Sequence, residues 1–268
     1  MEGLKNTNQT FWNRVAQENP LHYIATSRKD WTSEEFLQDG EWRVHKWVLP
    51  WLLSNGLDPK KTTFLEIGCG AGRFGIHIAK VVKKYIGLDI SERNIELFKA
   101  HLSSFHNVEL IVSDGHSLKE VPDSSIDAVF SYAVLQHVWE KEVVLSYLRE
   151  TMRVLSGQGM AKHHMAGSNR VSGFKMRHTR VQTLGNSRVS SRLLKKFVPA
   201  DFLIWAPMRY RSGTGLQGEG ICYKEAMHFL ASSGFSVRVE PFENHNLASR
   251  YWLLFAKRPL QGKEGGYE

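Results

Sequence analysis

Short apolar runs alternate with amphipathic segments through the middle of the chain. Each run has the length of a buried strand, and the runs are Thr62–Ile67, Tyr85–Leu88, Val108–Val112, Ile126–Ser131 and Gly159–Met165. Between them, the segments Arg73–Val82, Glu92–Leu102 and Lys141–Leu155 carry apolar residues at helical spacing. Strands separated by helices of this length predict a parallel, doubly wound α/β sheet.

The pattern changes near the C-terminal end. A helix is predicted over Tyr223–Ser233, and two apolar runs follow at Phe235–Val239 and Tyr251–Ala256. The connection between these runs, 240–250, is too short for a crossover helix, so we expect the two strands to be antiparallel.

Two segments fall outside the strand and helix alternation. Residues 1–57 predict two or three amphipathic helices rich in tryptophan, and Thr32-Ser-Glu-Glu35 has the form of a capping box. We expect this segment to be a helical cap that closes over a ligand cleft, with Trp12, Tyr23, Trp31 or Trp42 as apolar walls. The alternative is that these rings only pack the segment against the flank of the sheet.

The second segment, 166–220, is rich in Ser, Gly and cations and is predicted to be a lid inserted into the core. From Met160 to Arg211 there are eleven Lys or Arg residues and one acid, although the whole chain carries a net charge of only +8. A concentrated basic block indicates an anionic partner, or else a solvated surface. The predicted organisation is thus a cap (1–57), a core (58–165 and 221–260) interrupted by the lid, and a disordered tail (261–268).

Composition narrows the class of protein. The 268 residues include 42% hydrophobic residues, which is ordinary for a folded chain. There is neither an apolar leader nor a run near the ~18 residues that a membrane span needs, so a soluble, cytoplasmic protein is expected. The two cysteines, Cys69 and Cys222, exclude a disulfide framework and a cysteine-rich zinc site.

The chemistry begins where the first predicted strand runs into glycines, in Phe64-Leu-Glu-Ile-Gly-Cys-Gly-Ala-Gly-Arg-Phe-Gly75. Glycines at this point allow a ligand to approach the backbone closely, at the start of a helix. The same stretch matches a dinucleotide fingerprint, but Gly70 comes three residues after the strand, and Glu66 precedes it. A carboxylate there suits a ligand with an ammonium group better than one with a pyrophosphate.

Acidic residues end the next two strands. Asp89 follows the second strand, where it can accept hydrogen bonds from ribose hydroxyls, and Asp114 follows the third, where it can accept one from an exocyclic amine. Either acid could instead cap a helix or a turn.

With these residues in order, the sequence resembles the class I S-adenosylmethionine-dependent methyltransferases, particularly the small-molecule group related to ubiquinone and menaquinone biosynthesis. The likeness is close over Thr62–Gly159, including Ile126-Asp-Ala-Val-Phe-Ser-Tyr-Ala-Val-Leu-Gln-His-Val138, and loose over the C-terminal strands. The resemblance implies a Rossmann-like, mostly parallel seven-stranded sheet with an antiparallel C-terminal strand. It also implies S-adenosyl-L-methionine as the cofactor and S-adenosyl-L-homocysteine as the product.

The resemblance further implies a site. Glu66 and the backbone of Gly68 and Gly70 would hold the methionine part of the cofactor, Asp89 the ribose, and Ile90 and Asp114 the adenine, while Ser131 would lie beside the methionine part. Arg73 could pair with the cofactor carboxylate or simply be exposed. The other positions assigned to cofactor binding are Cys69, Gly115 and His116.

A general base is needed if the acceptor is a hydroxyl group. His137 is where the resembling enzymes often present a histidine, and its ordinary pKa suits proton removal near neutrality; a structural histidine is the alternative. Tyr132 is a second candidate. His163 and His164 point to opposite faces of a strand, which is poor geometry for chelation, so no metal is predicted.

The class of methyl acceptor is narrowed by motifs that the sequence lacks. The chain has neither the Asp/Asn-Pro-Pro-aromatic motif of exocyclic-amine DNA methyltransferases nor a Pro-Cys nucleophile. The prediction is methyl transfer to O, N or S of a small, anionic acceptor. The alternatives are an RNA methyltransferase that uses the 160–211 block, an inactive cofactor-binding subunit and an NAD-dependent oxidoreductase.

Overall fold

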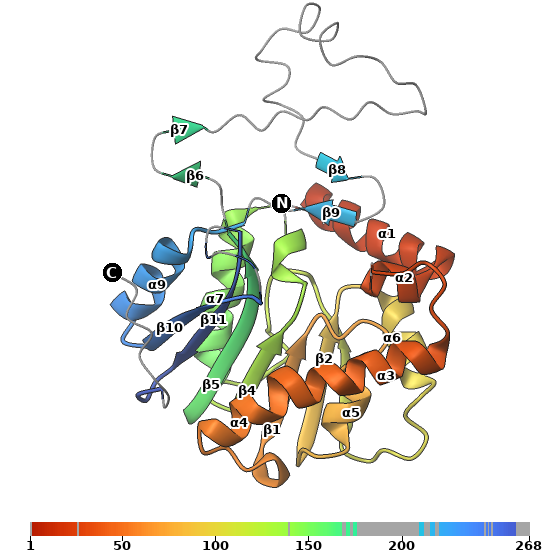
Figure 1. Ribbon diagram of the computed structural model, residues 1–268, viewed down its shortest axis with the longest axis horizontal. Coiled ribbons are helices and arrows are strands. Elements are labelled where there is room, and N and C mark those ends of the chain that lie inside the picture. The colour runs from red at the N-terminus through yellow and green to blue at the C-terminus, as the bar shows by residue number, and fades with distance from the viewer. Residues whose placement is uncertain are drawn as a thin grey trace, which may run out of the picture.

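A seven-stranded sheet forms the centre of the molecule (Figure 1). This computed structural model describes residues 2–25, 27–138, 140–167, 170–171, 174–175, 209–211, 215–217, 220–243, 245, 247 and 249–260. The strands of the sheet are β1 (Thr63–Ile67), β2 (Lys84–Asp89), β3 (Val108–Val112), β4 (Ile126–Ser131), β5 (Leu155–Ala166), β10 (Ser236–Pro241) and β11 (Arg250–Ala256). Their order is β10-β11-β5-β4-β1-β2-β3.

Strand directions confirm the doubly wound arrangement. Strand β1 pairs in parallel with both β2 and β4, while β2 pairs with β3 and β4 with β5 in the same sense. Strand β11 is antiparallel to both β5 and β10, as the short connection predicted. The carboxyl ends of the five parallel strands therefore meet at one edge of the sheet.

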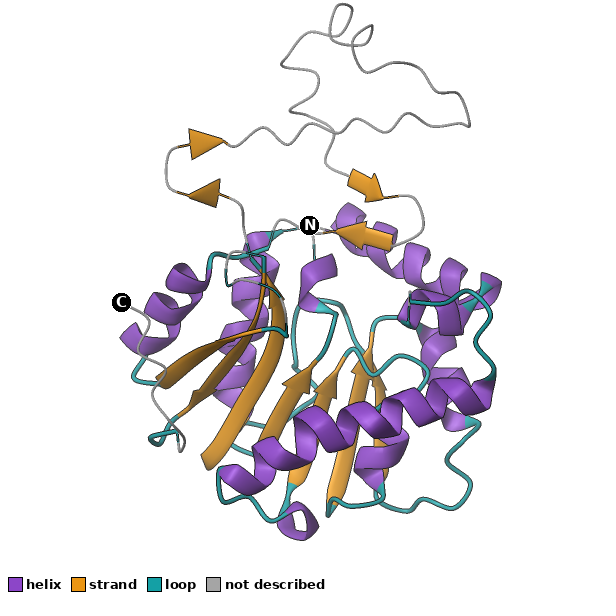
Figure 2. Cartoon of the chain, viewed as in Figure 1, coloured by secondary structure: helices purple, strands orange, loops and turns teal. Residues whose placement is uncertain are grey.

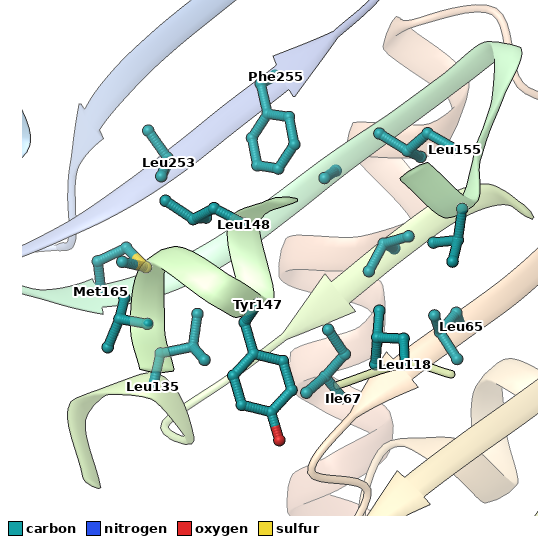
Figure 3. Packing of buried hydrophobic residues seen from close by; sticks show 14 of the residues in the cluster. Leu65, Ile67, Leu118, Leu135, Tyr147, Leu148, Leu155, Met165, Leu253 and Phe255 are labelled. Carbon is teal, nitrogen blue, oxygen red and sulfur yellow. The ribbon is translucent and has the colours of Figure 1, made fainter. Parts of the chain in front are cut away.

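Helices cover both faces of the sheet (Figure 2). One face packs against α7 (Lys141–Val154) and α9 (Tyr223–Ser232), and Figure 3 shows Leu148 of α7 close to Leu253 and Phe255 of β11. The opposite face packs against η1 (Val44–Val48), α4 (Leu49–Ser54), α5 (Gly75–Ala79) and α6 (Glu92–Lys99). Helix α5 is shorter than predicted at both ends: it begins at Gly75, after the turn at Gly72, whose φ is 89°, and it ends at Ala79.

The N-terminal segment has two parts with different neighbours. Helices α1 (Glu2–Glu18) and α2 (Pro20–Ile24) have an apolar cluster of their own, around Phe11 and Val15. They lie beyond the carboxyl ends of the strands, at the upper right of Figure 1. Two hydrogen bonds join them to the core: Ser91 donates to Asn13 at 2.8 Å, and Gln9 donates to the carbonyl of Ile90 at 3.1 Å. The ring of Trp12 also lies 5.4 Å from that of His137. We call α1 and α2 the cap.

Helix α3 (Ser33–Arg43) belongs instead to the side of the core. Its capping box, Thr32 with Glu35, is present as predicted, and the helix continues through η1 into α4. At Gly40 the helix touches the loop after β1 so closely that a Cβ atom there would overlap the carbonyl oxygen of Arg73. Residues 1–57 were expected to form one cap. In the structure, only α1 and α2 lie at the ends of the strands, and the helices from α3 to α4 lie along the side of the core.

The predicted lid, 166–220, lies mostly outside the described residues. Only four short strands are described within it: β6 (Arg170–Val171), β7 (Phe174–Lys175), β8 (Arg209–Arg211) and β9 (Gly215–Gln217), paired as two hairpins. The tail, 261–268, also lies outside the described residues. Among the helices that are described, none has both the length and the hydropathy required to cross a membrane.

Candidate functional site

A cavity of about 300 Å³ lies where the parallel strands end. Its walls come from the cap, from the loops after β1, β2, β3 and β4, and from the start of β11. The lining residues of the cap and of the segment after it are Asn8, Trp12, Tyr23, Ile24, Ala25 and Ser27. Of the four predicted wall residues, Trp12 and Tyr23 line the cavity, whereas Trp31 and Trp42 do not. Closure of the cap over a ligand stays a prediction.

The glycine loop forms the floor of the cavity. Gly68 and Gly70 have φ angles of 75° and 55°, a region that glycine adopts without steric cost. The N–H groups of Gly68 and Cys69 donate to the carbonyl of Leu88, at 2.7 Å and 2.9 Å, which ties the loop to β2. A Cβ at Gly68 would overlap the side chain of Val134, so the loop also sits tightly against the turn after β4.

Asp89 ends β2 at the cavity wall. Its carboxylate accepts hydrogen bonds from the N–H groups of Gly70 and Ser91, both at 2.9 Å, and a longer one from Asn94 at 3.4 Å. Burial raises the pKa of this carboxyl, although the two backbone hydrogen bonds oppose the shift. A carboxylate has about four acceptor positions, so at least one remains available to a ligand hydroxyl.

An apolar wall follows Asp89. The lining residues here are Ile90, Ser113 and Gly115. Gly115 has φ of 82°, and a Cβ on it would lie 2.6 Å from the Ile90 side chain. The narrow space beside Ile90 therefore depends on glycine at position 115, and a flat ring suits such a space.

Asp114 and His116 are not among the residues that line the cavity. The Asp114 carboxylate accepts hydrogen bonds from the Ser117 hydroxyl at 2.7 Å and from the N–H groups of His116 and Ser117. It also forms an ion pair with His116 at 2.8 Å. Partial burial would raise the pKa of Asp114, but these hydrogen bonds lower it to about 2. Asp114 here closes its own turn, and its predicted contact with adenine stays a prediction.

Glu66, Cys69 and Ser131 lie behind the cavity wall. Glu66 is buried on β1, where it accepts a hydrogen bond from the Tyr85 hydroxyl at 2.6 Å, and burial raises its pKa to about 8. The side chain of Cys69 is buried, and burial raises the pKa of its thiol. The buried Ser131 hydroxyl has no hydrogen-bond partner among the described residues. All three adjoin the site without lining it, and their predicted roles stay predictions.

Tyr132 and His137 also line the cavity. The Tyr132 ring packs against Trp47 and Phe74, with centroids 4.9 Å and 5.3 Å away. Burial raises the pKa of Tyr132, although Arg43 and Arg73 oppose the shift. His137 lies in the short turn η3 (Leu135–His137), with its ring 5.4 Å from that of Trp12 in the cap.

The backbone between these two residues is held in an unusual conformation. Ala133 has φ of 58°, and its N–H donates to Nδ1 of His164 at 3.3 Å. His163 faces the other side of β5, where its Nε2 contacts the Thr151 hydroxyl at 3.3 Å. The two histidines thus point in opposite directions, as predicted.

Three arginines reach the cavity, and the sequence analysis identified only one. Arg73 forms an ion pair with Asp39, and Asp39 also accepts a hydrogen bond from Nε of Arg43 at 2.8 Å. Although burial opposes it, these two guanidinium groups lower the pKa of Asp39. Arg43 and Arg250 were missed because one occupies the last turn of a helix and the other the first position of a strand, where a cation is unremarkable in sequence.

Comparisons with known proteins agree with this geometry. Residues 65–161 match the family described as "Methyltransferase domain". A probable S-adenosylmethionine-dependent methyltransferase of Mycobacterium tuberculosis is 34% identical over 97 residues, which are 36% of this chain and 32% of that protein. The ubiquinone biosynthesis O-methyltransferase of Pelagibacter ubique is 22% identical over 153 residues, 57% of this chain and 58% of that one. The chain thus matches about a third of the length of its mycobacterial relative.

Solved structures resemble the chain over nearly all of its length. The magnesium protoporphyrin IX methyltransferase of Synechocystis, solved with bound SAH, has a TM-score of 0.58 at 17% identity and covers 95% of this chain and 100% of that one. Phosphoethanolamine N-methyltransferase 1 of Haemonchus contortus has a TM-score of 0.56 at 18% identity, covering 98% of this chain and 51% of that one. Likeness at this level shows the fold, which is the Rossmann-like fold of these methyltransferases.

Proposed function

We propose that this chain, whose residues 65–161 match a methyltransferase domain, transfers a methyl group from S-adenosyl-L-methionine to O, N or S of a small acceptor. The observation that carries the proposal is the meeting of the glycine loop with Asp89 at a single cavity under the cap. The proposal accounts for the positive φ angles of the loop and for a buried carboxylate with an acceptor position to spare.

The residues present fit this cofactor. Asp89 offers a charged acceptor to a ribose hydroxyl, and the space between Ile90 and Gly115 suits the adenine. The backbone of Gly68 and Gly70, together with Arg73, would hold the methionine part. Nε of Arg73 is a buried donor with no acceptor among the described residues, so a ligand carboxylate would satisfy it.

When bound, S-adenosylmethionine supplies an electrophilic methyl group. The work of the protein is then to align the acceptor and to exclude water. Trp12 and Tyr23 of the cap line the cavity and displace solvent from it. His137 would take the proton from a hydroxyl acceptor through its imidazole, which suits a pH near neutrality. Tyr132 would act as a hydrogen-bond donor, because its raised pKa keeps the phenol neutral.

We further propose that the acceptor is a small anion. Support comes from the net charge of +8 and from the arginines at the cavity. The second candidate is an RNA acceptor bound by the cations of residues 160–211. Most of this block lies outside the described residues, and the observation in favour of RNA is the clustering of eleven cations in the sequence.

Calorimetry tests the cofactor assignment. We expect the full chain to bind S-adenosylhomocysteine with micromolar affinity and to show no heat with NAD. Binding of NAD alone would overturn the proposal in favour of an oxidoreductase. A second measurement separates an enzyme from an inactive subunit: after incubation with S-adenosylmethionine and an extract of small molecules, mass spectrometry should find a compound heavier by one CH₂ group.

A further inference from the structure

The proposed function gives no role in cofactor binding to two of the cations at the cavity, Arg43 and Arg250. Arg43 ends α3, and Arg250 begins β11, so they are 207 positions apart in the chain and approach the cavity from different elements. Both line the cavity, as does Tyr132. The Cζ of Arg43 lies 5.9 Å from the centroid of the Tyr132 ring, and the charge of Arg250 acts on both Tyr132 and His164.

Acidic residues do not balance this charge. Asp39 is shared between Arg43 and Arg73, and Glu243, which also acts on Tyr132, is engaged by Lys46 at 2.8 Å. Within the part of the chain that the structure describes, the guanidinium group of Arg250 has neither an ion pair nor a hydrogen bond. The wall around Tyr132 therefore carries more positive than negative charge.

Aromatic rings fix the position of one of the cations. The Arg43 guanidinium lies over Trp47, 4.9 Å from the ring centroid, and Nε of Arg43 donates to Asp39. This arrangement holds the planar group in place, and most of its N–H donors have no acceptor among the residues that the structure describes. The Tyr132 hydroxyl, on which the charges of both Arg43 and Arg250 act, adds a neutral donor at the same cavity.

We propose that the acceptor carries a carboxylate or phosphate group, which Arg250 and Arg43 bind through charge-assisted hydrogen bonds with the Tyr132 hydroxyl as a third donor. The inference rests on the proposed function, because it assumes that the cofactor fills the Asp89 end of the cavity. It differs from a lid-based selection of anions, since all three donors belong to the described core and its adjoining helix. Binding the remote anion would direct the nucleophile of the acceptor toward the methyl group.

The test uses the full chain saturated with S-adenosylhomocysteine. Benzoate, benzamide and inorganic phosphate serve as probes, titrated while protein NMR signals or heats are followed. Benzoate and benzamide have nearly the same shape and differ in charge. We expect benzoate or phosphate to bind and benzamide to bind at least about tenfold more weakly, which is the usual value of one charge-assisted contact.

Variants identify the donors. Arg250→Gln and Arg43→Gln should each weaken binding of the anion by about tenfold or more, and Arg250→Lys should retain part of it. Arg149→Gln is the matched control, because Arg149 lies on α7 over Phe229 and is exposed outside the cavity. Arg250→Gln should leave the affinity for S-adenosylhomocysteine unchanged, which also shows that the variant is folded.

The possible outcomes are distinct. Benzoate binding without phosphate binding supports a carboxylate acceptor, and the reverse supports a phosphate. Equal affinities for benzoate and benzamide, no binding of either anion, or full anion binding by Arg250→Gln and Arg43→Gln would each overturn this inference while leaving the cofactor assignment intact. Failure of the wild-type chain to bind S-adenosylhomocysteine would instead overturn the proposed function.

Discussion

The Asp89 carboxylate has enough acceptor positions to support local structure and, in addition, to accept a hydrogen bond from a ligand. The same carboxylate accepts the N–H of Gly70, which shapes the glycine loop, and the N–H of Ser91, which is the N-cap of α6. In sequence these were competing interpretations, a helix-capping acid or a ribose acceptor. The structure shows that they are compatible, since the cap uses only part of the acceptor capacity.

Replacing Asp89 with Ala should therefore weaken binding of S-adenosylhomocysteine by about 2–4 kcal/mol, through loss of a charge-assisted hydrogen bond and of the loop support. Isothermal calorimetry measures the change. Asp127→Ala is the control, because Asp127 accepts from the N–H of Thr63 and from Ser156, away from the cavity. An unaltered affinity in a folded Asp89→Ala variant would refute the ribose assignment.

Glu66 should make stability depend on pH. Its pKa is raised to about 8 by burial, above the ordinary value of 4.5, so the folded state keeps a proton that the unfolded chain releases. The proton stabilises the fold fully below about pH 4.5, and this contribution is lost as pH rises toward 8, by roughly 5 kcal/mol at the upper limit. Urea unfolding at a series of pH values should show the decline.

The variant Glu66→Gln should remove most of that decline, because its neutral amide can still accept the Tyr85 hydrogen bond. If wild type and variant lose stability equally between mildly acidic and alkaline pH, Glu66 is ionised in the folded state. The same variant tests the predicted contact with the cofactor ammonium group, since a direct contact would also cost affinity for S-adenosylhomocysteine.

His137 is the residue whose chemical role is most open to test. If it is the general base, His137→Asn should lower kcat by about 100-fold or more with little change in KM, and should remove the acidic limb of the pH profile. The measurement requires an identified hydroxyl acceptor. Retention of wild-type kcat, with only thermal stability reduced, would mean that His137 is structural and packs against Trp12.

At the scale of elements, the periodicity of apolar residues predicted the strands of the sheet, but it did not predict which N-terminal helices pack against the sheet. The five parallel strands and the antiparallel pair followed from apolar runs and connection lengths. The division of the N-terminal segment did not, because the apolar stripe of α3 and that of α1 look alike in sequence. Only the fold reveals that Val44 and Trp47 join the core, while Phe11 and Val15 form a separate cluster.

That separation has a measurable consequence. Deleting residues 1–25 removes the cap and the hydrogen bonds that Asn13 and Gln9 make to the core. It removes none of the side chains in the two apolar clusters of the sheet. We expect the shortened chain to keep near-native secondary structure and to unfold in one cooperative transition. Methyl transfer should fall by at least about 100-fold, because water enters the site. Circular dichroism and an activity assay measure both. Full activity would mean that the cap has no role in catalysis.

At the scale of the whole molecule, charge was visible in sequence but its location was not. The eleven cations between Met160 and Arg211 stand close together in the sequence, whereas the arginines at the cavity are far apart, at positions 43, 73 and 250. Tertiary structure brings the latter together, so no local pattern could reveal them. The place of Asp89 beside the glycine loop was predictable because its motif is local, and the place of Arg43 and Arg250 was not.

Salt distinguishes the two acceptor classes. A polyanion that displaces several counterions should lose affinity steeply between low and moderate salt, while a single small anion bound inside the cavity should change its KM by less than about threefold. Initial rates measured across a salt series with each candidate acceptor provide the comparison. A steep dependence that disappears when 170–211 cations are neutralised would favour RNA.

The contact at Gly40 restricts how this sequence can vary. Alanine in the middle of a helix is ordinarily worth about 1 kcal/mol over glycine, so selection for stability alone would favour replacing Gly40. Any side chain there would instead displace α3 from the Arg73 carbonyl, and Asp39 and Arg43, on the same helix, would move with it. Helix stability and the spacing of the site thus impose opposite demands on a single position, and we expect the spacing to prevail among natural variants of this chain.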